Sequence, residues 1–119
     1  MPKRLPDALT FLPLTPAVFH ILLALADADR HGYGIAREVA QRTDGTVRLG
    51  PGTLYGTLGR MVDAHLVSER ASSAARGDDD RRRFYRLTPL GRDVARAEAR
   101  RLALLVDVAR RKSLIGSDR

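Results

Sequence analysis

A small, polar face repeats at helical spacing in the segment GPGTLYGTLGRM, residues 50–61. The residues that recur at positions i, i+3, i+4 and i+7 are Thr53, Gly56, Thr57 and Arg60. On one side of a helix they would present hydroxyl groups, a guanidinium and a stretch of backbone that a partner can approach closely. This is the chemistry that contacts the phosphates and base edges of a nucleic acid. The segment therefore predicts a helix that binds DNA or RNA.

The glycines of this segment carry a cost that needs an explanation. Each interior glycine destabilises a helix by about 1 kcal/mol relative to alanine. At Gly52 and Gly56 the missing side chain would let the backbone approach DNA, and free N–H groups at the helix start can hold a phosphate. Close packing against another helix is the alternative, above all for Gly59. Tyr55 also has two interpretations: its hydroxyl donates to a phosphate, or its ring is half-buried and fixes the helix.

The composition limits the classes of protein to consider. A chain of 119 residues is expected to form one domain, and its net charge of +7 favours a polyanionic partner, either nucleic acid or an anionic membrane surface. The absence of cysteine excludes disulfide bonds and thiolate zinc sites. The unbroken apolar run at residues 21–26 is six residues long, whereas a membrane-spanning helix needs about 20. We therefore expect a cytoplasmic protein with no membrane partner.

Catalytic and metal-binding patterns are not found in the sequence. His20, His31 and His65 fall in three different predicted elements without a carboxylate cluster, which argues against a metal site. The adjacent acids at residues 78–80 lie in one turn and rarely converge on a cation. No glycine-rich phosphate loop lies between a strand and a helix, and no nucleophile has a base at recognisable spacing. We expect neither an enzyme nor a bound cofactor.

Three short helices and one long one are predicted from the helical periodicity. Thr15-Pro16 starts the first helix, because a threonine side chain caps free backbone N–H groups and proline has no N–H group to satisfy. The residues from there to 26 are apolar on nearly every side, so we expect this helix to be buried. A second helix is predicted over residues 33–42 and a third from residue 51. The predicted inner face of the third is Leu54, Leu58, Met61, Val62, His65 and Leu66.

The long helix begins at Thr88-Pro89, which repeats the first start, and extends to about residue 112. At 1.5 Å per residue its roughly 25 residues reach about 37 Å, which is longer than so small a domain can cover. Two strands precede it, around a turn at residues 77–80. Tyr85 and Leu87 alternate with Phe84 and Arg86 in the second strand, and we predict that Tyr85 and Leu87 face inward.

These elements are the parts of a winged helix-turn-helix, a mainly α fold of the α+β class. We predict a winged helix-turn-helix DNA-binding domain with an N-terminal arm at residues 1–88. Residues 89–119 are predicted to form a long C-terminal dimerisation helix and a tail. In such a fold the second helix of the pair lies in the major groove of DNA.

Three separated motifs carry a resemblance to a known family. They are GYGIA, GPGTLYGTLGRM and RRRFYRLTPLG, in that order within residues 15–95. The chain resembles the PadR family of bacterial transcriptional regulators, and the matching positions are Gly32, Tyr33, Gly52, Thr53, Leu54, Tyr55, Leu58, Arg60, Tyr85, Leu87, Thr88 and Gly91. It departs from the family pattern at Gly50, where serine is frequent, at Gly56, where proline is usual, and in the acids of RGDDDRRR at the wing tip.

The distribution of charge predicts how DNA is contacted. Residues 51–65 are formally neutral, whereas the wing and the N-terminal arm are basic, so we expect the helix to read bases and the wing and arm to hold phosphates. The predicted contacts are Gly52, Thr53, Tyr55, Gly56, Thr57, Arg60, Arg76, Arg81, Arg82, Arg83, Lys3 and Arg4. The alternative is that arginines on a strand edge only keep that edge solvated. Tyr33 is expected to be structural.

The final helix predicts a two-fold dimer, because a monomer would leave much of its apolar stripe in water. We expect it to pack against the first and last helices of a second copy. The predicted dimerisation residues are Phe19, Leu22, Val94, Leu102, Leu105, Val106 and Val108. Such a dimer would bind a near-palindromic operator whose half-site centres lie one turn of DNA, about 10 to 10.5 base pairs, or a multiple of it apart.

The function that these observations favour is sequence-specific regulation of transcription on double-stranded DNA. The resemblance further implies a repressor that a small-molecule effector releases, with the effector bound between the DNA-binding part and the dimer helices. Two alternatives use the same fold: a winged-helix module that binds RNA, and a module that binds a protein partner instead of DNA.

Overall fold

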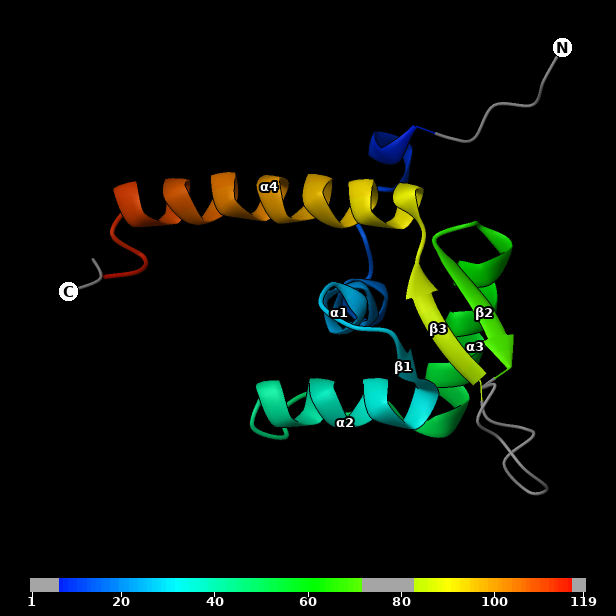
Figure 1. Cartoon of the computed structure of the whole chain (residues 1–119). Helices are drawn as coiled ribbons and strands as arrows, with labels where there is room; N and C mark the ends of the chain where they lie inside the picture. The colour runs from blue at the N-terminus through cyan, green and yellow to red at the C-terminus, as the bar shows by residue number, and fades with distance from the viewer. Residues whose placement is uncertain (1–6, 72–82, 117–119) are drawn as a thin grey trace, which may run out of the picture.

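The computed structural model of the chain describes residues 7–71 and 83–116. It is mainly helical with one small sheet, and so confirms the predicted α+β class (Figure 1). In chain order its elements are η1 (Ala8–Phe11), α1 (Pro16–Leu25), β1 (Arg30–His31), α2 (Gly32–Arg42), α3 (Pro51–Asp63), β2 (Val67–Ala71), β3 (Arg83–Leu87) and α4 (Pro89–Arg111). The short 3-10 helix η1 and the strand β1 were not predicted.

Both threonine-proline pairs start helices as predicted. The hydroxyl of Thr15 accepts a hydrogen bond from the N–H of Val18 at 3.3 Å, and Pro16 is the first residue of α1. The hydroxyl of Thr88 accepts from the N–H of Gly91 at 2.9 Å at the start of α4. Helices α2 and α3 begin at residues with no capping side-chain hydrogen bond, so their first N–H groups stay available to a ligand.

The sheet has the strand order β1-β3-β2, and both pairings are antiparallel. In β3 the inward direction predicted for Tyr85 and Leu87 is confirmed, because both side chains are buried. On the other face, the guanidinium of Arg86 pairs with the carboxylate of Asp29 at 2.9 Å and ties the loop after α1 to the sheet. Hydrogen bonding and attraction from Asp29 raise the pKa of Arg86.

Helix α1 lies between α4 and α2, at the centre of the fold (Figure 1). Its residues Ile21, Leu22 and Ala24 are fully buried, and so is Val94 of α4. The prediction that Leu22 and Val94 belong to a dimer surface is therefore wrong. An apolar stripe shows that a residue needs cover but not which chain supplies it, and here α1 and the first half of α4 cover each other.

The predicted inner face of α3 is confirmed at Leu54, Leu58, Met61 and Leu66, but it is wrong at His65. His65 is exposed and has a φ of 66°, in the left-handed region, where it follows the last turn of α3. The reversal turns the His65 side chain outward and the next side chain, Leu66, inward. A helical repeat cannot be extended past such a turn.

Glu98 is an acid in the apolar interface between α4 and the N-terminal segment. Its side chain is only 2% exposed, and its carboxylate accepts hydrogen bonds from the Arg101 Nε at 2.6 Å, the Arg101 Nη2 at 2.9 Å and the Leu14 N–H at 3.1 Å. Arg101, which interrupts the apolar stripe in the sequence, therefore neutralises a buried carboxylate. Beyond residue 98 no side chain of α4 within the described part of the chain is fully covered.

A prediction follows for the pH dependence of stability. The hydrogen bonds from Arg101 lower the pKa of Glu98 from 4.5, although burial opposes them. A carboxyl group with a depressed folded-state pKa stabilises the fold above its unfolded pKa, and this contribution disappears as the pH falls through the folded value. We therefore expect Glu98→Gln to be less stable than the wild type at pH 7, and the difference to shrink below pH 4.5. Urea unfolding of both proteins at several pH values measures this difference, and a constant gap would contradict the assignment.

Candidate nucleic-acid interface

Helix α3 presents five of its six predicted DNA contacts to solvent. Leu54, Leu58 and Met61 anchor its inner face in the core, which leaves the other side of the helix exposed. The predicted contacts that are exposed there are Gly52, Thr53, Tyr55, Gly56 and Arg60. This side of α3 can therefore meet the edge of a base without any rearrangement of the core.

Thr57 is the exception, because its side chain is only 3% exposed. The prediction that it contacts DNA directly is wrong, since it lies at the border of the helix where the neighbouring Leu58 and Leu54 are covered. Its hydroxyl instead accepts a hydrogen bond from Arg60 Nη2 at 3.3 Å. Thr57 therefore orients the guanidinium of Arg60.

The glycines of α3 are not required by packing within the chain. A Cβ added at Gly52 or Gly59 would meet no described atom within 4 Å, and at Gly56 it would meet only Arg60 Nη1, at 3.7 Å. Within the residues that the structure describes, the helix-packing alternative for Gly59 is wrong. The space left by the missing side chains faces solvent, where a partner can enter.

Tyr55 is half exposed, and its hydroxyl lies against the first turn of α2. A Cβ added at Gly32 would be 2.6 Å from the Tyr55 hydroxyl oxygen, so any side chain at Gly32 would push the tyrosine away. Gly32 thus sets the position of Tyr55, which connects two of the motifs singled out in the sequence. Tyr55 extends the exposed face of α3 toward the start of α2.

Tyr33 and Arg37 of α2 form a second group beside Tyr55 that was missed from the sequence. Tyr33 is 70% exposed, so the expectation that it is structural is wrong. The Arg37 guanidinium lies 5.9 Å from the centre of the Tyr33 ring, close enough for a cation-π contact. Their i, i+4 spacing on the outer side of a helix was the available signal.

The last residue of β2 and the first residue of β3 lie at the same side of the molecule. Figure 1 shows the starts of α2 and α3 together with the end of β2 and the start of β3, on the side away from α4. Arg83 of β3 is exposed, and its Nε lies 3.4 Å from the Glu69 carboxylate on β2. The other predicted phosphate contacts, Lys3, Arg4, Arg76, Arg81 and Arg82, lie outside the described residues.

Comparison with known proteins identifies this arrangement. The Transcriptional regulator PadR-like family matches residues 21–97, which include both helices of the helix-turn-helix, the hairpin and the start of α4. The chain belongs to the PadR-like family of transcriptional regulators. The resemblance expected from the three motifs is confirmed, and the family is one of regulators rather than enzymes.

Relatives of this PadR-like chain include the transcriptional regulator Rv3488 of Mycobacterium tuberculosis, which is 39% identical over 84 residues, covering 70% of this chain and 72% of the relative. Two uncharacterised relatives are longer: the chain spans 22% of a protein from a Streptomyces fradiae transposon and 64% of one from Lysinibacillus sphaericus.

Solved structures confirm the winged-helix fold with a long C-terminal helix. A PadR family regulator from Clostridium difficile superposes with a TM-score of 0.70 at 27% identity, over 82% of this chain and 97% of that one. Bacillus subtilis PadR in complex with operator DNA has a TM-score of 0.62 at 19% identity, over 71% of this chain and 46% of that one. The latter resemblance is one of fold.

Residues 7–71 and 83–116 contain neither a membrane-spanning helix nor a cluster of metal ligands. No helix there is long and apolar enough to cross a membrane. These residues also contain no group of three or more histidine or acidic side chains that could hold a metal ion.

Proposed function

We propose that this PadR-like chain is a regulator that binds a specific sequence of double-stranded DNA in the cytoplasm. The observation that carries the proposal is the exposed, glycine-rich side of α3, where the missing side chains leave room that nothing in the described chain fills. Backbone and short side chains can approach the floor of a major groove closely there, and Arg60 is the one cationic side chain of α3.

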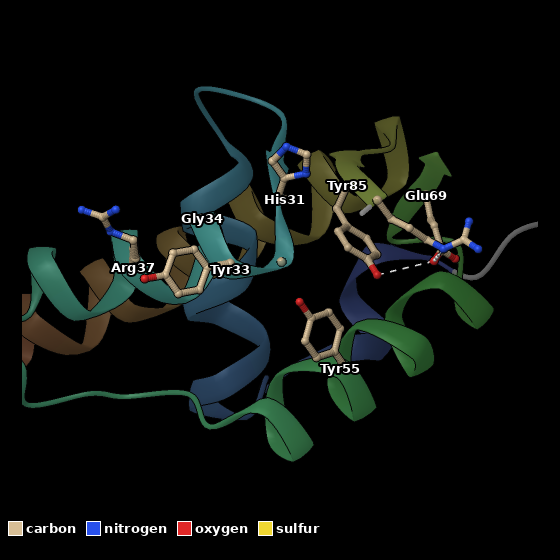
Figure 2. Close-up of a pocket in the computed structure, with 9 residues that line it drawn as sticks. His31, Tyr33, Gly34, Arg37, Tyr55, Glu69 and Tyr85 are labelled. Carbon is tan, nitrogen blue, oxygen red and sulfur yellow. Dashed lines mark hydrogen bonds and ion pairs between the residues drawn. The ribbon is translucent and has the colours of Figure 1, made fainter. Parts of the chain in front are cut away.

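Phosphate contacts are proposed to flank the reading helix. Tyr33 and Arg37 lie at the exposed start of α2, and Arg83 is the exposed first residue of β3. All three line one cavity together with Tyr55 (Figure 2). The predicted contacts of the N-terminal arm and the wing extend this set at residues outside the described ranges. Contacts of this kind fix the position of the protein on DNA, whereas contacts from α3 select the sequence.

We further propose that the protein acts as a homodimer on a near-palindromic operator and represses transcription until a small-molecule effector releases it. The exposed apolar second half of α4 supports the dimer, since the side chains of Leu104, Leu105, Val106 and Val108 are between 37% and 63% exposed. Phe19 and Leu102 are partly exposed and remain proposed members of the same interface.

Arg60→Ala and Arg83→Ala are expected to separate base reading from phosphate binding. If Arg60 contacts a base, its loss removes about 1–3 kcal/mol of discrimination and relaxes the preference at one operator position. Arg83→Ala should instead weaken binding to all sequences alike and reduce the salt dependence. Operators selected from random duplexes, followed by titrations against operator and random DNA at several salt concentrations, measure both effects.

The same titrations test the proposed function itself. Selection that yields no consensus, with equal affinity for single-stranded RNA, would favour the RNA-binding alternative. No binding to either nucleic acid would favour a protein-binding module. Identical effects of both variants on operator and random DNA would contradict the division of roles between Arg60 and Arg83.

A further inference from the structure

The guanidinium of Arg60 is folded back along α3, toward the start of the helix. Its Nη2 donates a hydrogen bond to the hydroxyl of Thr57, one turn earlier, at 3.3 Å, and its Nη1 lies 3.7 Å from the place of a Cβ added at Gly56. Helical side chains lean toward the N-terminus of their helix, and here a hydrogen-bond partner fixes that direction. We call Gly56 and Thr57 the arginine seat, because they lie against the two terminal nitrogens of one guanidinium.

Each residue of the arginine seat contributes what its type allows. The side chain of Thr57 is only 3% exposed, so the surrounding core holds its hydroxyl in place as an acceptor. A Cβ at Gly56 would already be in van der Waals contact with Nη1 of Arg60, so a longer side chain would compete with the guanidinium for the same space. The seat therefore gives Gly56 a function that offsets the cost of a glycine inside a helix.

The seated guanidinium keeps its charge and most of its donors available. No carboxylate in residues 7–71 or 83–116 forms an ion pair with Arg60. Arginine has several N–H donors, and the hydroxyl of Thr57 takes one of them. Arg60 is exposed on the side of α3 that also exposes Gly52 and Gly56. A partner that approaches this side meets a planar fork of donors in a fixed position.

The chemistry of base edges selects guanine as the partner of such a fork. Arginine only donates hydrogen bonds, and guanine presents two neighbouring acceptors, N7 and O6, in the major groove. Adenine presents a donor beside its N7, cytosine presents a donor, and thymine presents one acceptor beside a methyl group. A guanidinium that must align two donors at once loses less conformational freedom on binding when it is already held in place.

We propose that Arg60 reads one guanine in each half-site through paired hydrogen bonds to N7 and O6, and that Gly56 and Thr57 are positioning residues for its guanidinium. The seat places this group toward the start of α3, and residues near the start of the recognition helix are those that meet base edges in helix-turn-helix proteins. This inference rests on the proposed DNA-binding function and names the base that the function recognises.

Analogues of guanine in the operator test this reading. After selection of an operator from random duplexes, each guanine in turn is replaced by 7-deazaguanine, which lacks the N7 acceptor, or by hypoxanthine, which retains N7 and O6. We expect 7-deazaguanine at one position of each half-site to weaken binding of the intact chain roughly tenfold. Hypoxanthine at the same position should have little effect, and Arg60→Ala should be insensitive to both analogues there.

Thr57→Val and Thr57→Ser test the arginine seat in DNA binding. Valine keeps the shape of the buried side chain without its hydroxyl, whereas serine keeps the hydroxyl and is the matched control. Thr57→Val should weaken operator binding roughly threefold to tenfold, reduce the sensitivity to 7-deazaguanine and leave binding to random DNA unchanged. Thr57→Ser should bind like the wild type. Because Thr57 acts through Arg60, the valine should have no further effect in an Arg60→Ala chain.

Nitrogen-15 NMR of the free chain tests the seat without DNA. The guanidinium N–H groups of Arg60 should exchange with water more slowly than those of the exposed Arg100, and both Thr57→Val and Gly56→Leu should remove the difference. Equal exchange at the two arginines of the wild type would overturn the seat.

The DNA titrations separate failure of the inference from failure of the proposed function. A bound operator in which no guanine shows sensitivity that depends on Arg60 would overturn the guanine reading alone. Thr57→Val that weakens binding equally with and without Arg60, or equally on operator and random DNA, would overturn the positioning role of Thr57. A wild type that binds no DNA would overturn the proposed function together with the guanine reading.

Discussion

Replacing Gly91 by alanine is expected to destabilise the fold by about 3 kcal/mol or more, at the upper end of what overpacking costs. The first turn of α4 lies directly against the backbone that connects α3 to β2, and a Cβ added at Gly91 would overlap the carbonyl oxygen of Leu66 and lie 3.0 Å from its carbonyl carbon. These are backbone atoms, which cannot rotate away as a side chain can. The same carbonyl accepts hydrogen bonds from the N–H and the hydroxyl of Thr88, both at 3.1 Å, so moving it also disturbs the cap of α4.

Equilibrium unfolding in urea measures the effect, with Gly59→Ala as the matched control. An alanine at Gly59 meets no described atom within 4 Å and should stabilise α3 by up to about 1 kcal/mol. Gly91 is also helical, so helix propensity alone predicts that both variants become more stable. Opposite signs for the two variants would establish the contact with Leu66, and a Gly91→Ala protein as stable as the wild type would show that α4 does not lie so close.

Local chemistry made part of the fold predictable. Thr15-Pro16 and Thr88-Pro89 mark where helices begin, because the threonine cap and the proline favour a helix start through interactions within one turn of the chain. Strict alternation in a strand placed Tyr85 and Leu87 on the same side, and their burial confirms the side that we predicted to face inward. Strand β1 could not be predicted this way, since two residues show no periodicity and pair with β3 only after the chain has folded.

The candidate site was predictable only where one helix decides the outcome. The exposed side of α3 followed from its own periodicity, with an error at the border residue Thr57. The contact of Tyr55 with Gly32, and the place of Arg37 beside them, join helices that are distant in the sequence. Burial of Glu98 depends likewise on Leu14, 84 residues earlier, and no local pattern reports it.

The same limit explains the two errors about the dimer surface. Leu22 and Val94 lie on apolar stripes, as an interface requires, but the chain covers them itself. The second half of α4 differs from the first. Gly91, Val94 and Glu98 form the buried side of the first half, and Glu98 is the last buried residue of the described helix. The same side of the helix continues beyond Glu98, where the described chain does not bury it. At 100° per residue, Leu105 lies on this same side of α4. It is 53% exposed.

Leu105→Glu is therefore expected to convert the proposed dimer into a monomer. Burying a leucine side chain is worth about 1.5–3 kcal/mol, and a two-fold interface contains the substitution twice. The expected loss of about 3–6 kcal/mol weakens dimerisation by more than about 100-fold, and burying the new carboxylates costs more. Affinity for a palindromic operator should fall by a comparable factor, because two half-sites are no longer bound together. Binding to a single half-site should be unchanged, since α3 lies at the other side of the domain.

Ala103→Glu is the matched control for this variant. It introduces the same charge into the same exposed turn of α4, but about 160° around the helix from Leu105, away from the apolar stripe. Sedimentation of the three proteins at micromolar concentration, together with titrations against the palindrome and one half-site, distinguishes the outcomes. Because the substitution is on the surface, all three should unfold at similar urea concentrations as monomers. A wild type that sediments as a monomer, or a Leu105→Glu protein that still dimerises and binds the palindrome like Ala103→Glu, would remove α4 from the binding mechanism.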